Sequence, residues 1–204
     1  MADRLDAALI SAAGGGDREA FGVLVERHHR EVMRFVFRFL GLVDRHTAED
    51  LVQDVFLSAW RAAPRFRPRP GASVFSWLLR IATNTCLNYR RDRRLRLTVS
   101  MDEDRETSGR DRAHDAADAI LAAKERALQV QAAVADLPPA QRAAIVLREY
   151  HGLSYTEIAD AIDTSVSAVE SLLVRARRAL SAVLSATETE TPPQVSPELR
   201  VECL

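Results

Sequence analysis

The sequence predicts an all-α protein with two small helical domains joined by a flexible linker, the second domain containing a helix-turn-helix. Apolar residues recur at steps of three and four along most of the chain, and no segment alternates apolar and polar residues as an exposed strand does. A polar, acidic segment interrupts this pattern near the middle of the sequence. The length of 204 residues permits a small domain on either side of it.

The first domain is expected to span residues 1–97. Its opening helix should end near the three glycines at positions 14–16, because glycine is a poor helix former. A second helix should follow and bury one apolar stripe against the core. The residues of that stripe are Phe21, Leu24, Val25, His28, Val32, Phe35, Val36 and Phe39.

A third helix is predicted over residues 47–66, because Thr47 and Asp50 have the spacing of a capping box. Its apolar residues must be buried, which leaves a mixed, acidic face. An acidic face suits neither DNA nor a membrane, so its natural partner is a basic protein surface. Ordinary solvated helix surface is the alternative. The residues of this face are Asp50, Gln53, Asp54 and Leu57.

Residues 73–96 read as an amphipathic helix whose end is dense in arginine. Between residues 61 and 96 there are ten arginines and a single acid, Asp92, whereas the whole chain has a net charge of −1. This concentration of positive charge indicates a polyanionic partner. The arginines are Arg61, Arg65, Arg67, Arg69, Arg80, Arg90, Arg91, Arg93, Arg94 and Arg96.

Three other side chains in this region can hold an unpaired base. Asn84 and Asn88 are four residues apart and share one helix face, where their amides can hydrogen-bond a base edge. Phe66, in the preceding loop, can stack on such a base or wedge beside it. In the alternative interpretation the arginines only solvate the helix end, and Trp77 and Tyr89 belong to the core.

Residues 98–118 contain seven acids, three arginines and few apolar residues, which predicts a flexible linker. The second domain should cover residues 119–185, and its first helix should end at Pro138 and Pro139, because proline cannot continue a helix. The polar, acidic tail at 186–204 is expected to be disordered. One side of that first helix is expected to carry Leu121, Leu128 and Ala135.

The helix-turn-helix is predicted from local signals in residues 154–178. Ser154 and Glu157 make a capping box, so a helix should start at Tyr155. Asp163 is expected to take a left-handed conformation in the turn, and Ser165 to cap the second helix. The inward stripe of the second helix is predicted to be Val166, Val169, Leu173 and Ala176.

The outward face of this second helix fits the major groove of duplex DNA, with its first half near base edges. Arginines toward its end are expected to contact phosphates. The alternative is a helical hairpin with a solvated arginine face. The outward residues and terminal arginines are Ser167, Glu170, Ser171, Val174, Arg175, Arg177 and Arg178.

Several classes of protein are excluded by what the sequence lacks. Cys86 lies on an apolar stripe and Cys203 in the tail, so neither a zinc site nor a disulfide framework is expected. His28 and His29 are adjacent and point to different helix faces, so no metal site is expected either. We also find no phosphate loop and no nucleophile beside a base, which argues against an enzyme, a cofactor or a small-molecule substrate. Without a signal peptide or a membrane-spanning run, a cytoplasmic protein that does not insert into a membrane is expected.

The chain resembles a bacterial RNA polymerase sigma factor of the extracytoplasmic-function (ECF, group 4) type, in the sigma-70 family. The segment of such factors that grips the clamp helices of polymerase β′ is similar to AEDLVQDVFLSAWRA. The adjoining segment, which recognises and melts the promoter −10 element, is similar to FSWLLRIATNTCLNYRRDRR. The domain that binds the −35 element and the β flap is similar to LPPAQRAAIVLREYHGLSYTEIADAIDTSVSAVESLLVRARRAL.

The resemblance implies a role for each candidate residue. Core polymerase would bind Asp50, Gln53, Asp54 and Leu57. The −10 element would contact Phe66, Arg80, Asn84, Asn88, Arg90, Arg91, Arg93 and Arg94, with the two asparagines lining the pocket for a flipped base. The −35 element would contact Ser167, Glu170, Ser171, Val174, Arg175, Arg177 and Arg178. An anti-sigma factor is a further partner that the resemblance implies.

Two other functions remain open at this point. GLSYTEIADAI also resembles the helix-turn-helix of LuxR-type regulators, so the chain could be a one-component regulator that binds duplex DNA without polymerase. Alternatively, it could be a decoy that binds polymerase and starts no transcripts. The near-neutral net charge argues against tight autonomous DNA binding, because neutralised phosphates supply most non-specific affinity.

Overall fold

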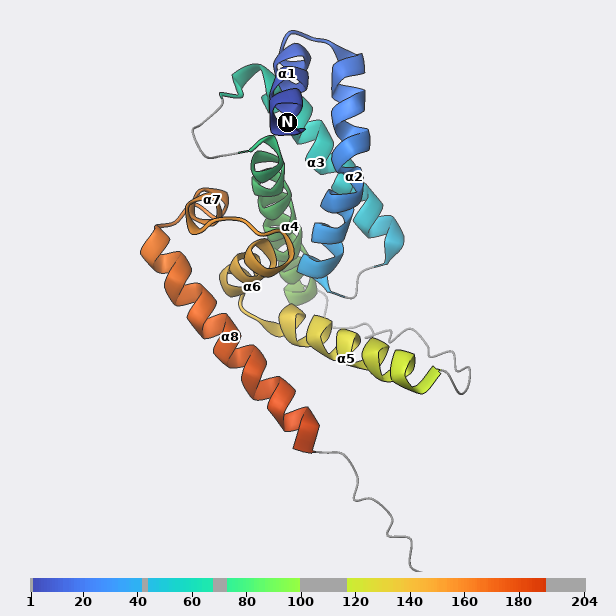
Figure 1. Ribbon diagram of the computed structural model, residues 1–204, viewed down its shortest axis with the longest axis vertical. Coiled ribbons are helices and arrows are strands. Elements are labelled where there is room, and N and C mark those ends of the chain that lie inside the picture. The colour runs from blue at the N-terminus through green and yellow to red at the C-terminus, as the bar shows by residue number, and fades with distance from the viewer. Residues whose placement is uncertain (1, 42–43, 68–72, 100–116, 190–204) are drawn as a thin grey trace, which may run out of the picture.

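The computed structural model describes residues 2–41, 44–67, 73–99 and 117–189 (Figure 1). All regular structure in these ranges is helical, as predicted. The first half contains α1 (Ala2–Gly14), α2 (Arg18–Leu40), α3 (Arg45–Ala62), the short 3-10 helix η1 (Ala63–Arg65) and α4 (Val74–Val99). The second half contains α5 (Ala117–Asp136), α6 (Pro139–Ile145), the π-helical turn η2 (Val146–Tyr150), α7 (Tyr155–Ala161) and α8 (Val166–Thr189).

The predicted linker and tail lie mostly outside the described residues. Within the described part, α4 continues to Val99 and α8 to Thr189, so helix extends slightly into both predicted segments. No helix in the described ranges is both long and apolar enough to cross a membrane.

The first half packs α1, α3 and α4 around α2. α2 begins at Asp17, whose carboxylate accepts a hydrogen bond from the Ala20 amide at 3.0 Å. Of the predicted stripe, Phe21, Val25 and His28 are only partly buried. The fully buried members are Leu24, Val32, Phe35, Val36 and Phe39, which form the centre of this half.

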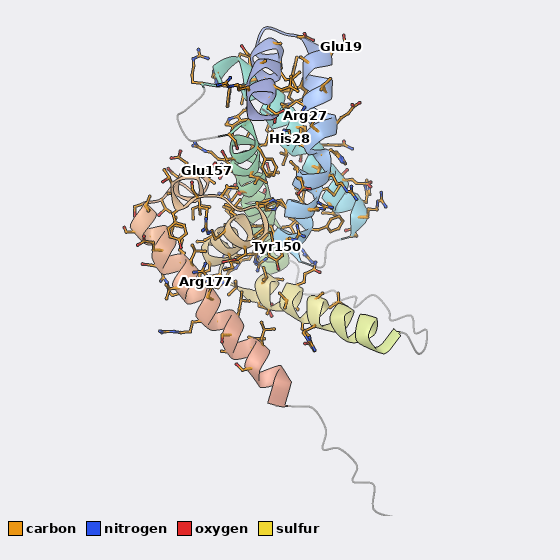
Figure 2. The ribbon with its side chains drawn as sticks, viewed as in Figure 1. Glu19, Arg27, His28, Tyr150, Glu157 and Arg177 are labelled. Carbon is orange, nitrogen blue, oxygen red and sulfur yellow. The ribbon has the colours of Figure 1, made fainter. Side chains whose placement is uncertain are left out.

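α1 is tied to α2 by a buried carboxylate. The carboxylate of Asp6 in α1 is 2.9 Å from Nε2 of His28 and 3.0 Å from Nε of Arg27. Figure 2 labels Arg27 and His28, both on α2. The ring of His28 in turn stacks on Phe75 of α4, with centroids 5.4 Å apart. Buried carboxylates need such partners, because burial of an unpaired charge is costly. The contacts fix α1 against the other helices of the first half.

The predicted start and end of the third helix were both wrong. α3 begins at Arg45, and its cap is Asp44 rather than Thr47. The amide and the hydroxyl of Thr47 both donate to the Asp44 carboxylate, at 2.8 and 2.6 Å. Aspartate accepts these bonds as a charged group and stabilises the start of a helix more strongly than threonine. At the other end α3 stops at Ala62 and tightens into η1, four residues before the predicted end at 66.

α4 has the predicted amphipathic pattern. Leu78, Leu79 and Ala82 are fully buried, and Cys86 is buried with them as expected. Burial raises the pKa of the Cys86 thiol to about 12. The thiolate, which is the reactive form, is therefore scarce at neutral pH.

Of the residues predicted to share one side of α5, Leu128 is exposed and Ala135 is partly buried. The buried residues are Ala133 and Val134 near the C-terminal end of α5, and Leu137 directly after it. Helical spacing identifies a face but not how much of a helix is covered. As predicted, α5 ends before Pro138 and Pro139, and Pro139 occupies the first turn of α6.

The helix-turn-helix forms as predicted, with one exception. Ser154 and Glu157 make both hydrogen bonds of a capping box at the start of α7. Asp163 has φ +53°, and the Ser165 hydroxyl accepts from the Ala168 amide at 3.2 Å. The exception is Val166, the first residue of α8, which is 40% exposed. The rest of the inward stripe is buried: Val169, Leu173 and Ala176.

Replacing Asp163 with glycine is expected to stabilise the protein. A left-handed conformation strains a side chain with a Cβ, whereas glycine adopts it freely, so the gain is up to about 1 kcal/mol. Urea unfolding followed by circular dichroism measures the change. The control is Gln129→Gly in the interior of α5, at an exposed position, which should cost about 1 kcal/mol. A loss of stability in both variants would contradict this explanation of the turn.

The two halves pack against each other in this structure. α5 contacts α2, α7 lies alongside α4, and η2 contacts α2 (Figure 1). Buried residues of both halves form one continuous apolar cluster.

Candidate nucleic-acid interface

α4 presents a polar row on one side. Arg80, Asn84 and Asn88 follow one another at four-residue steps, so they share a helix face and are spaced about 6 Å apart along its axis. Both asparagines are exposed, whereas Arg80 is partly buried. Thr83 faces the interior and donates its hydroxyl to the Leu79 carbonyl at 2.7 Å. The exposed amides have the donors and acceptors that a base edge requires.

The described residues on either side of 68–72 make defined contacts. Phe66 packs edge-on against Trp77, with ring centroids 5.1 Å apart. Nη1 of Arg67 donates to the Phe66 carbonyl at 2.9 Å. At the start of α4, Ser73 accepts a hydrogen bond from the Ser76 amide at 2.9 Å through its hydroxyl oxygen. These contacts position Phe66 beside the first turn of α4.

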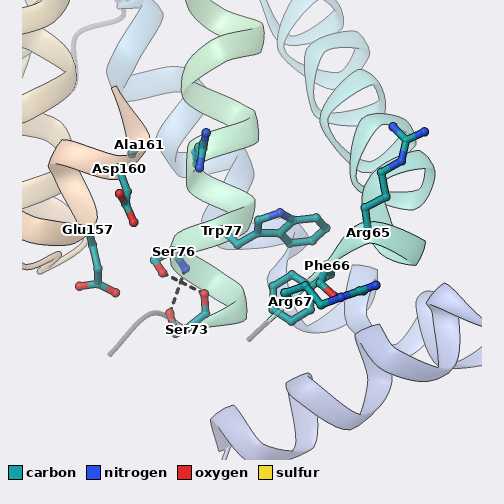
Figure 3. A pocket seen from close by; sticks show the side chains of 10 residues that line it. Arg65, Phe66, Arg67, Ser73, Ser76, Trp77, Glu157, Asp160 and Ala161 are labelled. Atoms are coloured by element: carbon teal, nitrogen blue, oxygen red, sulfur yellow. Dashed lines mark hydrogen bonds between the residues drawn. The ribbon is translucent and has the colours of Figure 1, made fainter. Parts of the chain in front are cut away.

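A hollow lies between Phe66 and the first turns of α4 (Figure 3). It brings Phe66 and Arg80 together, as the sequence predicted for residues with a common function. Trp77, which was expected to be core, forms part of the wall and is only partly buried. The opposite wall comes from α7 of the second half. The lining residues are Arg65, Phe66, Arg67, Ser73, Ser76, Trp77, Arg80, Glu157, Asp160 and Ala161.

The arginine cluster at the end of α4 lies apart from this hollow. Arg90 is ten residues beyond Arg80, or about 15 Å along the helix axis. Burial lowers the pKa of Arg90, the charge of Arg93 lowers it further, and Asp136 partly opposes both. All four arginines of the cluster line a groove, and its other wall comes from Ala135, Pro139 and Arg142 of the second half.

The outward face of α8 is exposed along its whole predicted length. Its hydrogen bonds stay within the helix: the Ser171 hydroxyl donates to the Ser167 carbonyl at 3.1 Å, and Nε of Arg175 donates to the Ser171 carbonyl at 3.2 Å. Arg177 instead reaches Glu149 of η2 at 2.7 Å, and this hydrogen bond raises the pKa of Arg177. An exposed pair of this kind contributes little stability, so Arg177 can exchange Glu149 for a phosphate.

The mixed face of α3 borders an apolar groove. All four residues of this face are exposed: Asp50, Gln53, Asp54 and Leu57. Two of them, Gln53 and Leu57, line the groove itself. Sequence reasoning missed the other side of this groove, since its aromatic residues belong to stripes that predict core. The lining residues are Arg18, Phe21, Val25, His29, Val52, Gln53, Phe56, Leu57 and Trp60.

The groove is walled by pairs of rings. Phe21 of α2 packs edge-on against Trp60 of α3, with centroids 5.1 Å apart. His29 stacks on Phe56 with centroids 6.2 Å apart. Large partly exposed aromatic side chains flanked by carboxylates are typical of a protein-binding surface.

Fold and surfaces together define an all-α protein with a helix-turn-helix of the kind that binds duplex DNA. Comparison with known families narrows the class. The model of sigma-70 region 2 matches residues 24–96, and that of sigma-70 region 4 matches residues 127–180. The first range contains the polar row of α4, and the second contains the helix-turn-helix.

Known relatives match nearly the whole chain. The ECF RNA polymerase sigma-E factor of Escherichia coli K12 is 35% identical over 187 residues, which cover 88% of this chain and 95% of that protein. The ECF RNA polymerase sigma factor SigM of Mycobacterium tuberculosis is 35% identical over 189 residues, covering 92% of this chain and 88% of that protein. The chain belongs to the ECF sigma factors, which bind core RNA polymerase and direct promoter-specific transcription initiation.

Solved structures agree in fold. A structure of CnrH in complex with the cytosolic domain of CnrY gives a TM-score of 0.62 at 31% identity, covering 89% of this chain and 98% of that one. The sigma factor RpoE of Bartonella quintana, solved with the anti-sigma factor NepR, gives a TM-score of 0.63 at 24% identity, covering 81% and 96%.

Proposed function

We propose that the two halves of this sigma factor divide promoter recognition between them while α3 holds the polymerase. The observation that carries this proposal is the position of two chemically distinct surfaces. An amide-bearing row on α4 lies in the region 2 match, and an exposed helix-turn-helix face lies in the region 4 match.

The first role is docking on the clamp helices of polymerase β′. Asp50 and Asp54 supply negative charge beside an apolar groove that contains Leu57 and Trp60. Apolar side chains in such a groove supply affinity when they are desolvated, and the carboxylates orient a basic partner. Gln53 adds a hydrogen-bonding group at the border between the two.

The second role is capture of the −10 non-template strand. Asn84 and Asn88 are exposed and can hydrogen-bond a flipped base, and Phe66 and Trp77 offer aromatic surface nearer the start of α4. Arg80 contacts the backbone in this proposal. The cluster Arg90, Arg91, Arg93 and Arg94 follows Asn88 along α4 and contacts the DNA backbone in this proposal.

The third role is reading the −35 element. The first turns of α8 present Ser167, Glu170, Ser171 and Val174 to the major groove, and Arg175, Arg177 and Arg178 bind phosphates. The β flap of polymerase binds the same half of the chain. Polymerase then holds both halves on one promoter and raises their effective concentration, which offsets the near-neutral charge of the chain.

We further propose that an anti-sigma factor holds the protein inactive, supported by the solved complex of the sigma factor RpoE with the anti-sigma factor NepR. The chain acts in the cytoplasm, where its polymerase partner is, and carries no catalytic activity of its own. RNA synthesis belongs to the polymerase.

Gel filtration with purified bacterial core polymerase tests this proposal. The chain should co-elute with core polymerase, and it should bind duplex promoter DNA weakly in the absence of polymerase. A one-component regulator predicts the reverse: tight duplex binding alone and no co-elution. That result would also leave the α3 groove and the α4 row without a role.

A further inference from the structure

The outward face of α8 carries one acid. The other outward residues between 167 and 178 are serines, a valine and arginines, whereas Glu170 brings negative charge to a surface that meets DNA in the function proposed above. α8 lies along one edge of the molecule, and this face is exposed (Figure 1). The DNA backbone repels a carboxylate, so an acid at this place needs a contact that compensates for the repulsion.

The buried side of α8 fixes the direction in which Glu170 points. Three residues of α8 pack into the core and are at most 1% exposed: Val169, Leu173 and Ala176. Glu170 shares its own face with Ser167 and Val174, which lie three and four residues away along the helix. The side chain of Glu170 is exposed, and α8 cannot rotate to bury it without exposing the core.

Ordinary helix chemistry does not account for this carboxylate. An acid stabilises a helix from its first turn, but α8 has no acid there, and the Ser165 hydroxyl serves as its cap. An acid also stabilises a helix by pairing with a basic residue three or four positions away. None of the residues at those distances from Glu170 is basic. They are Val166, Ser167, Leu173 and Val174.

The carboxylate of Glu170 also differs from others in the protein in its lack of a partner. Glu31 and Glu49 each pair with an arginine of their own helix, and Glu149 pairs with Arg177 of α8. Glu170 makes no such ion pair and no side-chain hydrogen bond with any residue that the structure describes. Its oxygens are therefore free to accept hydrogen bonds from a bound molecule.

The major groove of DNA offers a carboxylate only two bases with a donor. Cytosine presents its N4 amino group and adenine its N6 amino group, whereas guanine and thymine present acceptors and a methyl group. An ionised carboxylate can only accept hydrogen bonds. Adenine places its N7 acceptor beside the amino group, and N7 repels a carboxylate oxygen. Cytosine has no acceptor at this edge, so it is the base that suits Glu170 best.

Ser171 adds a second acceptor next to Glu170. The Ser171 hydroxyl donates to the Ser167 carbonyl at 3.1 Å, which uses its one hydrogen and leaves its oxygen lone pairs for DNA. Nε of Arg175 donates to the Ser171 carbonyl at 3.2 Å, which leaves the two Nη groups for a phosphate. The first turns of α8 thus present acceptors to the bases, and the next turn presents donors to the backbone.

We propose that Glu170 reads a cytosine of the −35 element by accepting a hydrogen bond from its N4 amino group. This assignment rests on the function proposed above for α8 and names a base that the helix selects. Guanine or thymine at the same position leaves the carboxylate desolvated and without a donor, and adenine sets N7 against it. Glu170 is then a determinant of promoter choice.

A promoter library randomised over the −35 region tests the assignment with the complex of this chain and core polymerase. Run-off transcripts that carry a barcode for each promoter give the base preference at every position. The wild type should prefer cytosine at one position about tenfold over guanine or thymine, within the usual range for one mismatched base pair.

Two substitutions of Glu170 should change this preference in different ways. Glu170→Ala removes the acceptor and should lose the preference for cytosine at that position alone. Glu170→Gln should shift the preference to adenine at the same position, because a glutamine amide pairs with both N6 and N7 of adenine. Alanine and glutamine are both good helix formers, so α8 should be retained, and circular dichroism checks this.

Glu26→Ala is the control, because it removes an exposed acid from α2 in the first half of the chain. It should keep the wild-type base preferences. A uniform rise in transcription from all promoters with Glu170→Ala, without a change in base preference, would overturn the assignment, because the carboxylate would then only repel phosphates.

The remaining outcomes separate the assignment from the function on which it rests. Transcripts without a cytosine position in the wild type, or with the cytosine preference retained in Glu170→Ala, would overturn the assignment alone. A complete lack of transcripts with every protein would contradict the sigma role itself.

Discussion

Replacing Leu57 with aspartate should nearly abolish binding to core RNA polymerase, lowering the affinity about thirtyfold or more. Leu57 is 51% exposed on α3 and lines the groove with Phe56 and Trp60. Aspartate there places an unpaired charge on a surface that must be desolvated on binding, which is costly. Because the side chain is exposed in the free protein, the substitution should leave the fold intact. Competition with a fluorescent sigma factor for core polymerase measures the loss.

The control is Leu5→Asp, at a leucine of α1 that is 49% exposed and has no proposed partner. It should bind core polymerase like the wild type. Normal affinity of Leu57→Asp would remove the α3 groove from the account, and an equal loss in both variants would mean that the added charge acts non-specifically.

The second large effect is expected for Asn84→Ala, which should reduce promoter opening about tenfold or more while polymerase binding is unchanged. A well-placed pair of hydrogen bonds to a base edge contributes about 1–3 kcal/mol, and alanine removes both. Alanine is also a better helix former than asparagine, so α4 should be retained. Permanganate reactivity of unpaired thymines in the −10 region measures opening.

Gln129→Ala serves as the control, because it removes an exposed amide from α5, away from both proposed DNA surfaces. It should open promoters like the wild type. If Asn84→Ala lost polymerase binding to the same extent as opening, Asn84 would be a structural residue rather than a base contact.

Local signals in the sequence predicted the helices well where short-range chemistry determines them. The capping box of Ser154 and Glu157 and the left-handed Asp163 both depend on neighbours within a few residues. The predicted start of α3 was wrong because local signals offered more than one cap. Two candidate caps lie three residues apart, and the pattern alone did not show that Asp44 would accept the hydrogen bonds of Thr47.

Surfaces were harder to predict than helices. Val166 and Leu128 fall on apolar stripes but lie where no other helix covers them. Trp77, Phe21 and Trp60 have the opposite character, since their spacing predicts core and yet each lines a hollow or groove. Periodicity shows which residues share a face, and only the packing of other helices decides whether that face is covered.

The contact between the halves left no trace in the sequence. Nη1 of Arg142 in α6 donates to the Phe39 carbonyl of α2 at 2.9 Å, although the two residues are 103 positions apart and an arginine in a short helix normally predicts solvated surface. Gly41, which has positive φ, lies so close to Ala135 of α5 that an added Cβ would be 2.6 Å from the Cβ of Ala135. Such long-range complementarity depends on the tertiary arrangement.

Run-off transcription with bacterial core polymerase, with and without this chain, on a library of candidate promoters tests the central claim most directly. We expect new transcripts that start downstream of a shared pair of −35 and −10 motifs and that depend on Asn84. Formation of a complex with polymerase without any new transcript would contradict the account and make the chain a decoy.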